Sequence, residues 1–191
     1  MNTITTKNYT LKLEHDELAE SPREWDNLGK MICFHKRYTL GDDHDYRPED
    51  YSGWDEMQTA IIKNEDAAII LPIYMYDHSG ITISTSPFSC PWDSGRIGFI
   101  CISKKKIREE YSVKRITKKL IDRVTEYLKG EVETYDQYLR GDVYCFTVTN
   151  NETGEEEDSC GGFFGDDIKT NGVLDNLSEE IRTEILAEMD K

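Results

Sequence analysis

Residues 67–103 read AAIILPIYMYDHSGITISTSPFSCPWDSGRIGFICIS, two apolar runs that flank a polar, turn-rich segment. The run at 67–74 is almost entirely apolar, as is typical of a strand covered on both faces. Pro72 cannot donate a hydrogen bond to a neighbouring strand, so we expect an edge or a bulge there. After the turn DHSG, apolar and polar residues alternate over 81–86, and the run at 96–103 is apolar again. The pattern predicts three antiparallel strands in a meander.

Helical and strand patterns also alternate in the rest of the chain. Apolar residues recur at helical spacing from residue 104 to residue 141, with a kink or break expected at Gly130. Two strand-like runs flank an acidic turn and predict a hairpin over 142–165, and Ser178 is the expected N-cap of a final helix. We predict an α+β fold with an antiparallel sheet of about six or seven strands and three or four helices packed mainly on one face. The length favours a single domain over residues 1–191.

Charge is distributed unevenly along the chain, whose net charge is −15. Residues 1–103 carry 9 basic and 17 acidic side chains, 104–129 carry 10 and 4, and 130–191 carry 4 and 17. A surface this negative repels nucleic acid and anionic lipid over roughly 8 to 10 Å at physiological salt. The charge therefore predicts a basic protein partner and no membrane association.

The cysteine pattern and the apolar runs bear on the compartment. The longest apolar run, AAIILPIYMY, has about half of the roughly 20 residues that a membrane-spanning helix needs, and the first residues lack the pattern of a signal peptide. We expect a cytoplasmic protein. The five cysteines form no C-x-x-C pair, so we expect free thiols and neither a zinc site nor another cofactor. They are Cys33, Cys90, Cys101, Cys145 and Cys160.

Residues 76–95 concentrate the side-chain types of a reaction centre. Asp77 and His78 precede the strand predicted at 81–86, whereas Cys90 and Asp93 follow it. Six residues of strand separate the two groups by about 20 Å, which is too far for shared chemistry. We predict no catalytic residues in this chain.

A ligand site of another kind is suggested by the segment GDDHDY. Asp43 and His44 could meet His35 from the preceding strand, and the aromatic Trp92 or Phe163 could stack on a ligand. Imidazoles and carboxylates can bind a transition metal, but the spacing matches no metal motif, so no metal is predicted. A solvated polar loop is the simpler interpretation of GDDHDY.

The last third of the chain concentrates carboxylates around the predicted hairpin. Duplex DNA carries a phosphate every 3.4 Å or so along each strand, so a row of carboxylates can occupy a basic nucleic-acid channel. The residues predicted to bind a partner in this way, either close together or along one edge, are Glu155, Glu156, Glu157, Asp158, Asp166 and Asp167. In contrast, the basic stretch 104–123 could contact nucleic acid directly, although an exposed helix face with local ion pairs also explains it.

Four segments carry a resemblance that covers most of the chain: NLGKMICFHKRYTLGDDHDY, LPIYMYDHSGITISTSPFSCPWDSGRIGFI, GEVETYDQYLRGDVYCF and DSCGGFFGDD. With these segments the chain resembles a family of small acidic proteins found in bacteriophages and other mobile elements of Gram-positive bacteria. The resemblance implies a phage setting, in which small acidic proteins often inhibit host defence, including restriction enzymes and CRISPR effectors. It implies no catalytic residues.

Charge and resemblance together predict a phage or mobile-element inhibitor of a host nucleic-acid-targeting defence system, of the anti-CRISPR or antirestriction type. Such an inhibitor is not an enzyme. It would present a DNA-mimicking acidic surface to a host nucleic-acid-binding effector in the bacterial cytoplasm. An alternative is an anti-defence protein that binds or hydrolyses a nucleotide signal through His35, Asp43 and His44. A second alternative is a DNA-associated phage protein that uses the basic 104–123 face.

Overall fold

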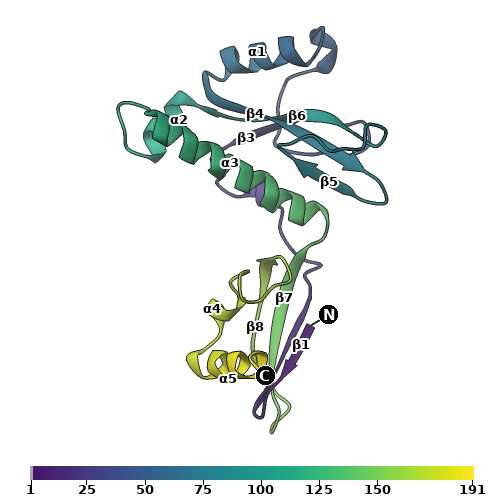
Figure 1. Ribbon diagram of the computed structural model, residues 1–191, viewed down its shortest axis with the longest axis vertical. Helices are drawn as coiled ribbons and strands as arrows, with labels where there is room; N and C mark the ends of the chain where they lie inside the picture. The colour runs from purple at the N-terminus through teal and green to yellow at the C-terminus, as the bar shows by residue number, and fades with distance from the viewer. Residues whose placement is uncertain (1) are drawn as a thin grey trace. The chain divides into compact units, whose positions relative to one another are not determined.

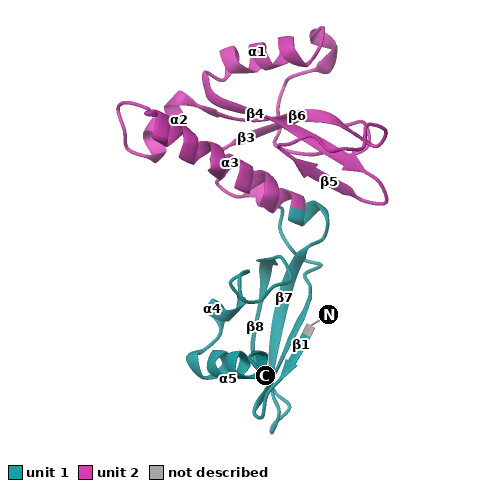
Figure 2. Ribbon diagram, in the orientation of Figure 1, with its two compact units in different colours: residues 1–21, 137–191 teal, residues 22–136 magenta. Residues whose placement is uncertain are grey.

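The chain folds into two compact units, which Figure 2 shows in different colours. The computed structural model describes residues 2–191. Unit 1 consists of Met1–Ser21 and Gln137–Lys191, and unit 2 is Pro22–Asp136. Within residues 2–191, each unit contains one four-stranded antiparallel sheet. The α+β class is therefore confirmed, whereas the expected single sheet of six or seven strands is wrong. That residues 1–191 form one domain stays a prediction.

Unit 1 is built from both ends of the chain. Its strands are β1 (Asn2–Thr5), β2 (Tyr9–His15), β7 (Val143–Asn150) and β8 (Glu156–Phe164), in the order β1-β2-β7-β8. The single-sheet prediction fails because β7 pairs with β2, placing Leu11 opposite Val148 and Leu13 opposite Phe146. A strand near the N-terminus thereby becomes the centre of a second sheet.

Two helices of unit 1 cover one face of its sheet: α4 (Val173–Asn176) and α5 (Glu179–Met189) (Figure 1). As predicted, the Ser178 side chain caps α5, accepting a hydrogen bond from the Ile181 amide. Residues that alternate with the apolar ones, such as Lys12 and Thr147, point to the other face and stay partly exposed. The core between sheet and helices consists of Leu11, Leu13, Phe146, Val148, Phe163, Ile168, Val173, Leu177, Ile181 and Ile185.

Unit 2 contains the second sheet. Its strands are β3 (Lys30–Cys33), β4 (Ala67–Asp77), β5 (Ile81–Ser84) and β6 (Ser94–Ser103), in the order β3-β6-β4-β5. The helices are α1 (Trp54–Asn64), α2 (Lys104–Glu110) and α3 (Lys118–Leu139), of which the last three residues belong to unit 1. Two short 3-10 helices are η1 (Pro22–Glu24) and η2 (Pro48–Asp50).

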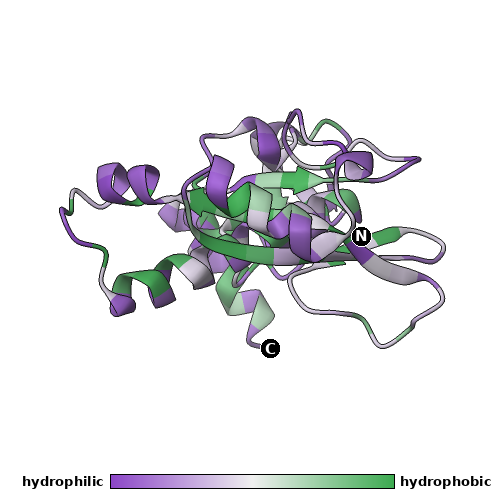
Figure 3. Ribbon diagram, turned by 90° about the horizontal axis from the view of Figure 1, so that it is seen from above, coloured by the Kyte–Doolittle hydropathy of each residue, from purple (hydrophilic) through white to green (hydrophobic). Residues whose placement is uncertain are grey.

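Helices cover both faces of the unit 2 sheet, contrary to the prediction of one face (Figure 1). Phe99 of β6 packs in one buried cluster with Met57 and Ile61 of α1. The next residue, Ile100, points the other way, and a methyl group placed on Gly29 would meet both Ile100 and Leu128 of α3. Every residue of β6 from Ile97 to Ile102 is buried, and the strands appear as hydrophobic green ribbon in Figure 3.

Residues 67–103 do not form the predicted meander, because β5 and β6 both pair with β4. The pairing with β5 covers only Tyr74–Asp77, whereas the pairing with β6 extends along most of β4. Pro72 lies opposite Phe99 of β6, before the pairing with β5 begins, and a register shift follows between Ile73 and Tyr74. The predicted edge or bulge at Pro72 is thus observed.

The long helical pattern breaks at residues 111–117, between α2 and α3, and not at Gly130 as predicted. The Thr117 hydroxyl accepts a hydrogen bond from the Leu120 amide at 3.3 Å and so caps the new helix. Helix α3 continues through Gly130 because Leu128 and Val132, on either side, are buried. Burial of this apolar stripe outweighs the low helix propensity of a single glycine.

Candidate functional site

A cavity of about 880 Å³ opens on unit 2. Its walls come from the segment after β3, from the start of α1 and from β6. Aromatic rings and basic side chains dominate the lining, which includes Phe34, His35, Lys36, Arg37, Tyr38, His44, Trp54 and Arg96. This composition is unlike the chain as a whole, whose net charge is −15.

The segment that lines the cavity after β3 leaves the sheet at one end and returns beside β3 at the other. The Phe34 amide donates to Ile97 O of β6 at 2.7 Å, after which the chain leaves the sheet. It returns at Gly41, whose φ is +75° and which forms an isolated bridge with Ile32. A Cβ at Gly41 would lie 2.6 Å from Met31 O, so only glycine fits this turn.

A buried ion pair fixes the end of this loop. Asp42 accepts hydrogen bonds from Arg23 Nε at 2.8 Å and Nη2 at 2.6 Å, and from the Met31 amide at 2.7 Å. Arg23 is 5% exposed and also pairs with Glu131 of α3 at 3.3 Å. Removal of one partner from such a network leaves an uncompensated buried charge, which costs about 3–5 kcal/mol. The loop is therefore a rigid wall of the cavity.

Arg96 is the most informative side chain of the cavity. Its guanidinium carbon lies 6.0, 5.5 and 5.6 Å from the ring centroids of Trp54, Tyr74 and Phe99, and Nη2 donates to the Tyr74 hydroxyl at 3.1 Å. Within residues 2–191 no carboxylate lies within ion-pair distance of Arg96. It is thus a partly buried cation that aromatic rings stabilise and that still has donors available for an anion.

A second group of stacked side chains lies at the exposed rim. The His35 and Tyr38 rings stack with centroids 4.9 Å apart, and the Arg37 guanidinium lies 5.4 Å from the Tyr38 centroid. Arg37 also forms an ion pair with Asp77 of β4. The His35 Nδ1 accepts the Arg37 amide at 3.3 Å, so its Nε2 is the nitrogen left for other partners.

His44 is held differently from His35. Its Nε2 lies 2.9 Å from Cys33 O and must therefore donate a proton to that carbonyl. The Nδ1 atom is buried and has no hydrogen-bond partner among the described residues. The ring packs 4.9 Å from the Phe34 ring. With one nitrogen engaged and the other shielded, His44 is a wall of the cavity and is poorly placed to exchange a proton with a ligand.

The structure brings together three of the five residues predicted for the ligand site. His35, Asp43 and His44 all line the cavity. Trp92 instead lies in the loop between β5 and β6 and is 91% exposed, and Phe163 is buried in the core of unit 1. Neither of these two aromatic residues lines the cavity. Nothing in the local sequence shows where a loop or a strand of another sheet will lie.

Sequence reasoning missed Trp54 and Arg96. Trp54 recurs with Met57 and Ile61 at helical spacing, as is typical of the apolar face of a helix, and it packs on Phe99 with ring centroids 5.7 Å apart. Its other neighbour, Phe34 at 6.1 Å, shows that the same ring also borders the cavity. Arg96 is a lone cation directly before the apolar run of β6. A charged residue beside a buried strand was the one feature of the sequence that could have marked it as a candidate site residue.

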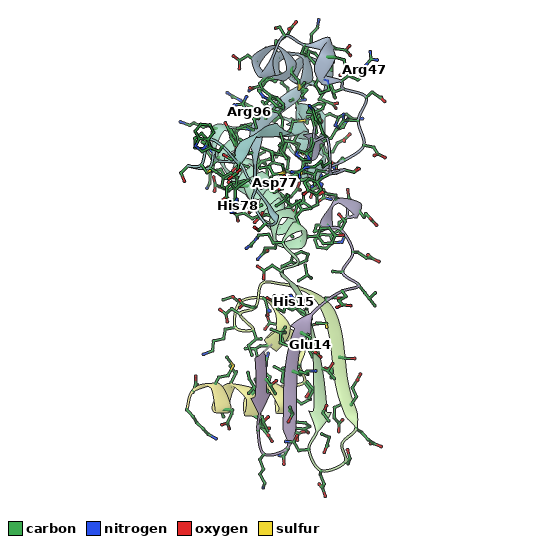
Figure 4. All side chains as sticks on the ribbon, turned by 90° about the vertical axis from the view of Figure 1, so that its right-hand side faces the viewer. Glu14, His15, Arg47, Asp77, His78 and Arg96 are labelled. Carbon is green, nitrogen blue, oxygen red and sulfur yellow. The ribbon has the colours of Figure 1, made fainter. Side chains whose placement is uncertain are left out.

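The predicted separation within residues 76–95 is wrong. The His78 Nδ1 lies 3.4 Å from Asp93 Oδ2, and Cys90 Sγ lies 3.8 Å from the same oxygen. The Asp77 amide donates to Asp93 O at 2.8 Å. The two ends meet because the chain folds back, so that β6 begins beside the end of β4, where Figure 4 labels Asp77 and His78. Even so, no group of three His, Cys, Asp or Glu side chains in residues 2–191 has the geometry to bind a metal.

The acidic residues predicted to bind a partner lie along one sheet edge, in two groups. β8 is an edge strand of the unit 1 sheet, with Glu156, Glu157 and Asp158 at its start. Asp166 and Asp167 follow its end, and the eight residue steps of β8 span about 26 Å. The first group lies at the hairpin tip, where Glu155, Glu156 and Glu157 are exposed.

Carboxylates of α5 add to the acidic hairpin end. The Tyr9 hydroxyl donates to Glu180 at 3.1 Å, and this bond is the main reason that the pKa of Tyr9 is raised. The negative charges of Glu157 and Glu184 raise it further, which places carboxylates from β8 and α5 around one ring. The sequence does not predict that α5 lies near the hairpin, because only the tertiary fold brings them together.

Two thiols of unit 2 are buried. Burial raises the pKa of both Cys33 and Cys101 to about 12, so neither is a nucleophile at neutral pH. Cys33 lines the cavity as an apolar residue.

Comparisons with protein-family models, curated proteins and solved structures gave no match. Among the described residues, no helix combines the length and the apolar character needed to cross a membrane.

Proposed function

We propose that unit 2 binds a planar anionic ligand of the nucleotide class in the cavity lined by Arg96. The observation that carries the proposal is the state of Arg96, a partly buried guanidinium surrounded by aromatic rings and without a carboxylate partner in residues 2–191. A guanidinium has five N–H donors, and Tyr74 uses one of them. A phosphate accepts two such donors in parallel and offsets the cost of the buried charge.

The remaining lining suits an aromatic base. Phe34, Trp54 and Tyr38 offer flat apolar surfaces, and base stacking on aromatic side chains contributes about 1–3 kcal/mol per base. The volume, about 880 Å³, lies within the range of roughly 300–1,000 Å³ that is usual for small-molecule sites. Lys36 and Arg37 at the rim would attract the negative charge of the ligand.

These contacts support binding more than turnover. The stacking surfaces and cations hold a ligand in place, whereas His44, one of the residues predicted to bind or hydrolyse a nucleotide signal, donates to Cys33 O and has its other nitrogen shielded. In the phage setting that the resemblance implies, such a protein would sequester a nucleotide signal of host defence. This is the alternative function derived from the sequence, now assigned to Arg96, Trp54 and Phe34 rather than to His44.

Calorimetric titration with AMP, adenosine and ribose 5-phosphate tests the site. AMP should bind more tightly than either half of the molecule. Arg96→Gln should weaken AMP by about 10- to 100-fold and leave adenosine unchanged, because only the phosphate contact is lost. Trp54→Leu should weaken adenosine and leave ribose 5-phosphate unchanged.

The matched control is Arg47→Gln, which removes the same charge from an exposed residue paired with Asp50 and is labelled with Arg96 in Figure 4. If the two arginine variants bind AMP equally well, or if the intact protein does not bind AMP at millimolar concentration, the proposal is wrong.

The acidic hairpin end of unit 1 supports a second proposed function. Its exposed carboxylates, with those of α5, offer the surface that a stoichiometric DNA-mimicking inhibitor needs against a basic host effector. Replacement of Glu155, Glu156, Glu157 and Asp158 by lysine should abolish inhibition of a purified restriction endonuclease or CRISPR nuclease. Replacement of Asp166 and Asp167, about 26 Å away, should have a smaller effect. Equal effects of both sets would argue against a contact at the hairpin tip.

A further inference from the structure

A second surface of unit 2 combines exposed cations with exposed aromatic rings. The cations belong to residues 104–123, which carry 9 basic and 3 acidic side chains in α2, the following loop and the first turns of α3. The rings belong to Trp25, after η1, and to Tyr127 of α3, which are 49% and 55% exposed. Tryptophan and tyrosine are enriched where proteins contact partners, because their rings are apolar and carry a polar N–H or O–H group.

The cations of this surface fall into two classes. Lys104 pairs with Asp66 at 2.7 Å, Lys105 with Glu109 at 3.8 Å and Lys106 with Asp26 at 4.0 Å. Others are exposed and have no carboxylate within ion-pair distance in the described part of the chain; they are Arg108, Lys114, Arg115, Lys118 and Lys119. The ion pairs expected from the sequence on this helix face therefore do not account for its charge.

The aromatic residues border two shallow hollows that share Tyr127 and Asn27. One, of about 270 Å³, lies between Trp25 and Tyr127 beside Gly130. The other, of about 380 Å³, has Tyr111, Arg123 and Lys106 in its wall, along with the carboxylates of Asp26 and Glu110. The Arg123 guanidinium lies 5.4 Å from the Tyr111 centroid. Lys106 and Arg123 thus line the same hollow as Tyr111 and Tyr127, and Lys119, Arg123 and Tyr127 follow one another at i, i+4 spacing on α3.

We propose that this surface binds single-stranded nucleic acid, with phosphates on the unpaired cations and bases on Trp25 and Tyr127. Single-strand sites combine a cationic track with aromatic side chains on which successive bases stack. A duplex would leave the two rings unused, because its bases are already stacked on one another. The proposal does not depend on the AMP site, since none of its residues lines that cavity.

The charge of the rest of the chain limits where nucleic acid can bind. Outside residues 104–123 the chain carries 14 basic and 35 acidic side chains, so most of the remaining surface, the cavity lined by Arg96 excepted, repels a nucleic-acid chain. Affinity should therefore depend strongly on salt and on this one surface. For single strands, each phosphate contact contributes about 0.7 to the slope of log K against log salt concentration.

Fluorescence anisotropy with a labelled 15-nucleotide oligo(dT) and a duplex of the same length tests the proposal at several salt concentrations. The single strand should bind at least about 10-fold more tightly than the duplex. Trp25→Ala with Tyr127→Ala should weaken the single strand about 10-fold or more and leave weak duplex binding unchanged. Lys118→Glu with Lys119→Glu should weaken both and reduce the salt slope by about 0.7 per lost contact.

Matched controls separate this surface from other effects. Trp92→Ala removes an exposed tryptophan that borders neither hollow, and Lys7→Glu with Lys12→Glu makes the same charge change in unit 1. Both should bind oligo(dT) like the intact protein, as should Arg96→Gln. Equal affinity for duplex and single strand, or no loss in the Trp25 and Tyr127 variant, would overturn the proposal.

Light scattering without nucleic acid tests whether this surface instead binds the acidic unit 1 of a second copy of the chain. The proposal predicts that molar mass does not change with protein concentration at low salt. Self-association that Lys118→Glu with Lys119→Glu abolishes would assign the surface to protein contact and overturn nucleic-acid binding.

Discussion

The two units contain the same kind of sheet but differ in net charge. Each has four antiparallel strands in the described residues, yet unit 1 carries 6 basic and 18 acidic side chains while unit 2 carries 17 and 20. Their net charges are therefore −12 and −3. The acidity that dominates the composition belongs mainly to unit 1, and it conceals two cationic surfaces in unit 2.

The two sheets also differ in how many of their faces are covered by helices. In unit 1, α4 and α5 pack on one face, and the residues of the other face, such as Thr147, are polar. In unit 2, α1 and α3 cover both faces, so that the apolar run of β6 is buried throughout. Burial on both sides holds Arg96 and Trp54 in fixed positions, which a ligand site requires.

The largest expected effect tests how tightly the unit 2 sheet is packed. A Cβ on Gly98 of β6 would collide with Ile32 O and lie 2.9 Å from Cys33 Cα of β3. Both contacts are backbone, so Gly98→Ala should destabilise unit 2 by at least about 2 kcal/mol. All three tryptophans, Trp25, Trp54 and Trp92, lie in unit 2, so tryptophan fluorescence during urea unfolding reports on this unit.

Two other glycines serve as controls for that prediction. Gly95→Ala, in the same strand, has open space around its Cβ and should change the free energy of unfolding little. A Cβ on Gly161 in unit 1 would collide with the carboxylate of Asp16 and lie 3.5 Å from Cys145 Cβ, so Gly161→Ala perturbs unit 1, and the fluorescence transition of unit 2 should stay unchanged. An equal loss in the Gly95 and Gly98 variants would show that the close approach of β3 and β6 is not as tight as described.

Local sequence was sufficient for the elements but not for their partners. Two strand-like runs around an acidic turn predicted the β7–β8 hairpin, and the Ser178 cap predicted the start of α5. Nothing in the sequence shows that β2 pairs with β7, whose paired residues are 129 to 141 positions away, because both strands have the same half-apolar pattern. The number of sheets follows from that pairing, so the single-sheet prediction failed while the α+β class held.

The candidate site shows the same limit. His35, Asp43 and His44 lie in one short segment, and sequence proximity was enough to group them. Arg96 and Trp54 join them only through the β3–β6 pairing and the packing of α1. The predicted distance of about 20 Å between His78 and Asp93 was wrong for the same reason. The length of the strand between them does not give their distance when the chain folds back after that strand.

A smaller effect compares the thiols of the two units. Cys160 is exposed in unit 1, whereas burial raises the pKa of Cys33 and Cys101 in unit 2 to about 12. At pH 8, iodoacetamide should modify Cys160 at least about 100-fold faster than either buried thiol, because the thiolate is the reactive form. Mass spectrometry of digested samples measures each site. Gly98→Ala should accelerate only the unit 2 thiols, and rapid modification of Cys33 in the intact protein would contradict its burial.

The smallest effect concerns the acidic end of unit 1 and its dependence on pH. The Thr6 hydroxyl donates to Glu184 at 2.7 Å and Asn8 Nδ2 donates at 2.5 Å, and these bonds lower the pKa of Glu184. A carboxyl group whose pKa is lower in the folded state stabilises the fold above its unfolded pKa of about 4.3, and this stabilisation is lost as pH falls through the folded value.

Glu184→Gln should therefore lower the melting temperature of unit 1 slightly at pH 7, and the difference from the intact protein should shrink as pH falls below the unfolded pKa of about 4.3. Circular dichroism detects this transition, while tryptophan fluorescence, confined to unit 2, should not change. Glu56→Gln is the counterpart in unit 2, where the Ser52 hydroxyl lowers the pKa of Glu56, and its effect should appear in the fluorescence signal. If Glu184→Gln shifts the fluorescence transition as well, the two units do not unfold independently. The units must then be compared by the ligand affinities of their variants and not by their melting temperatures.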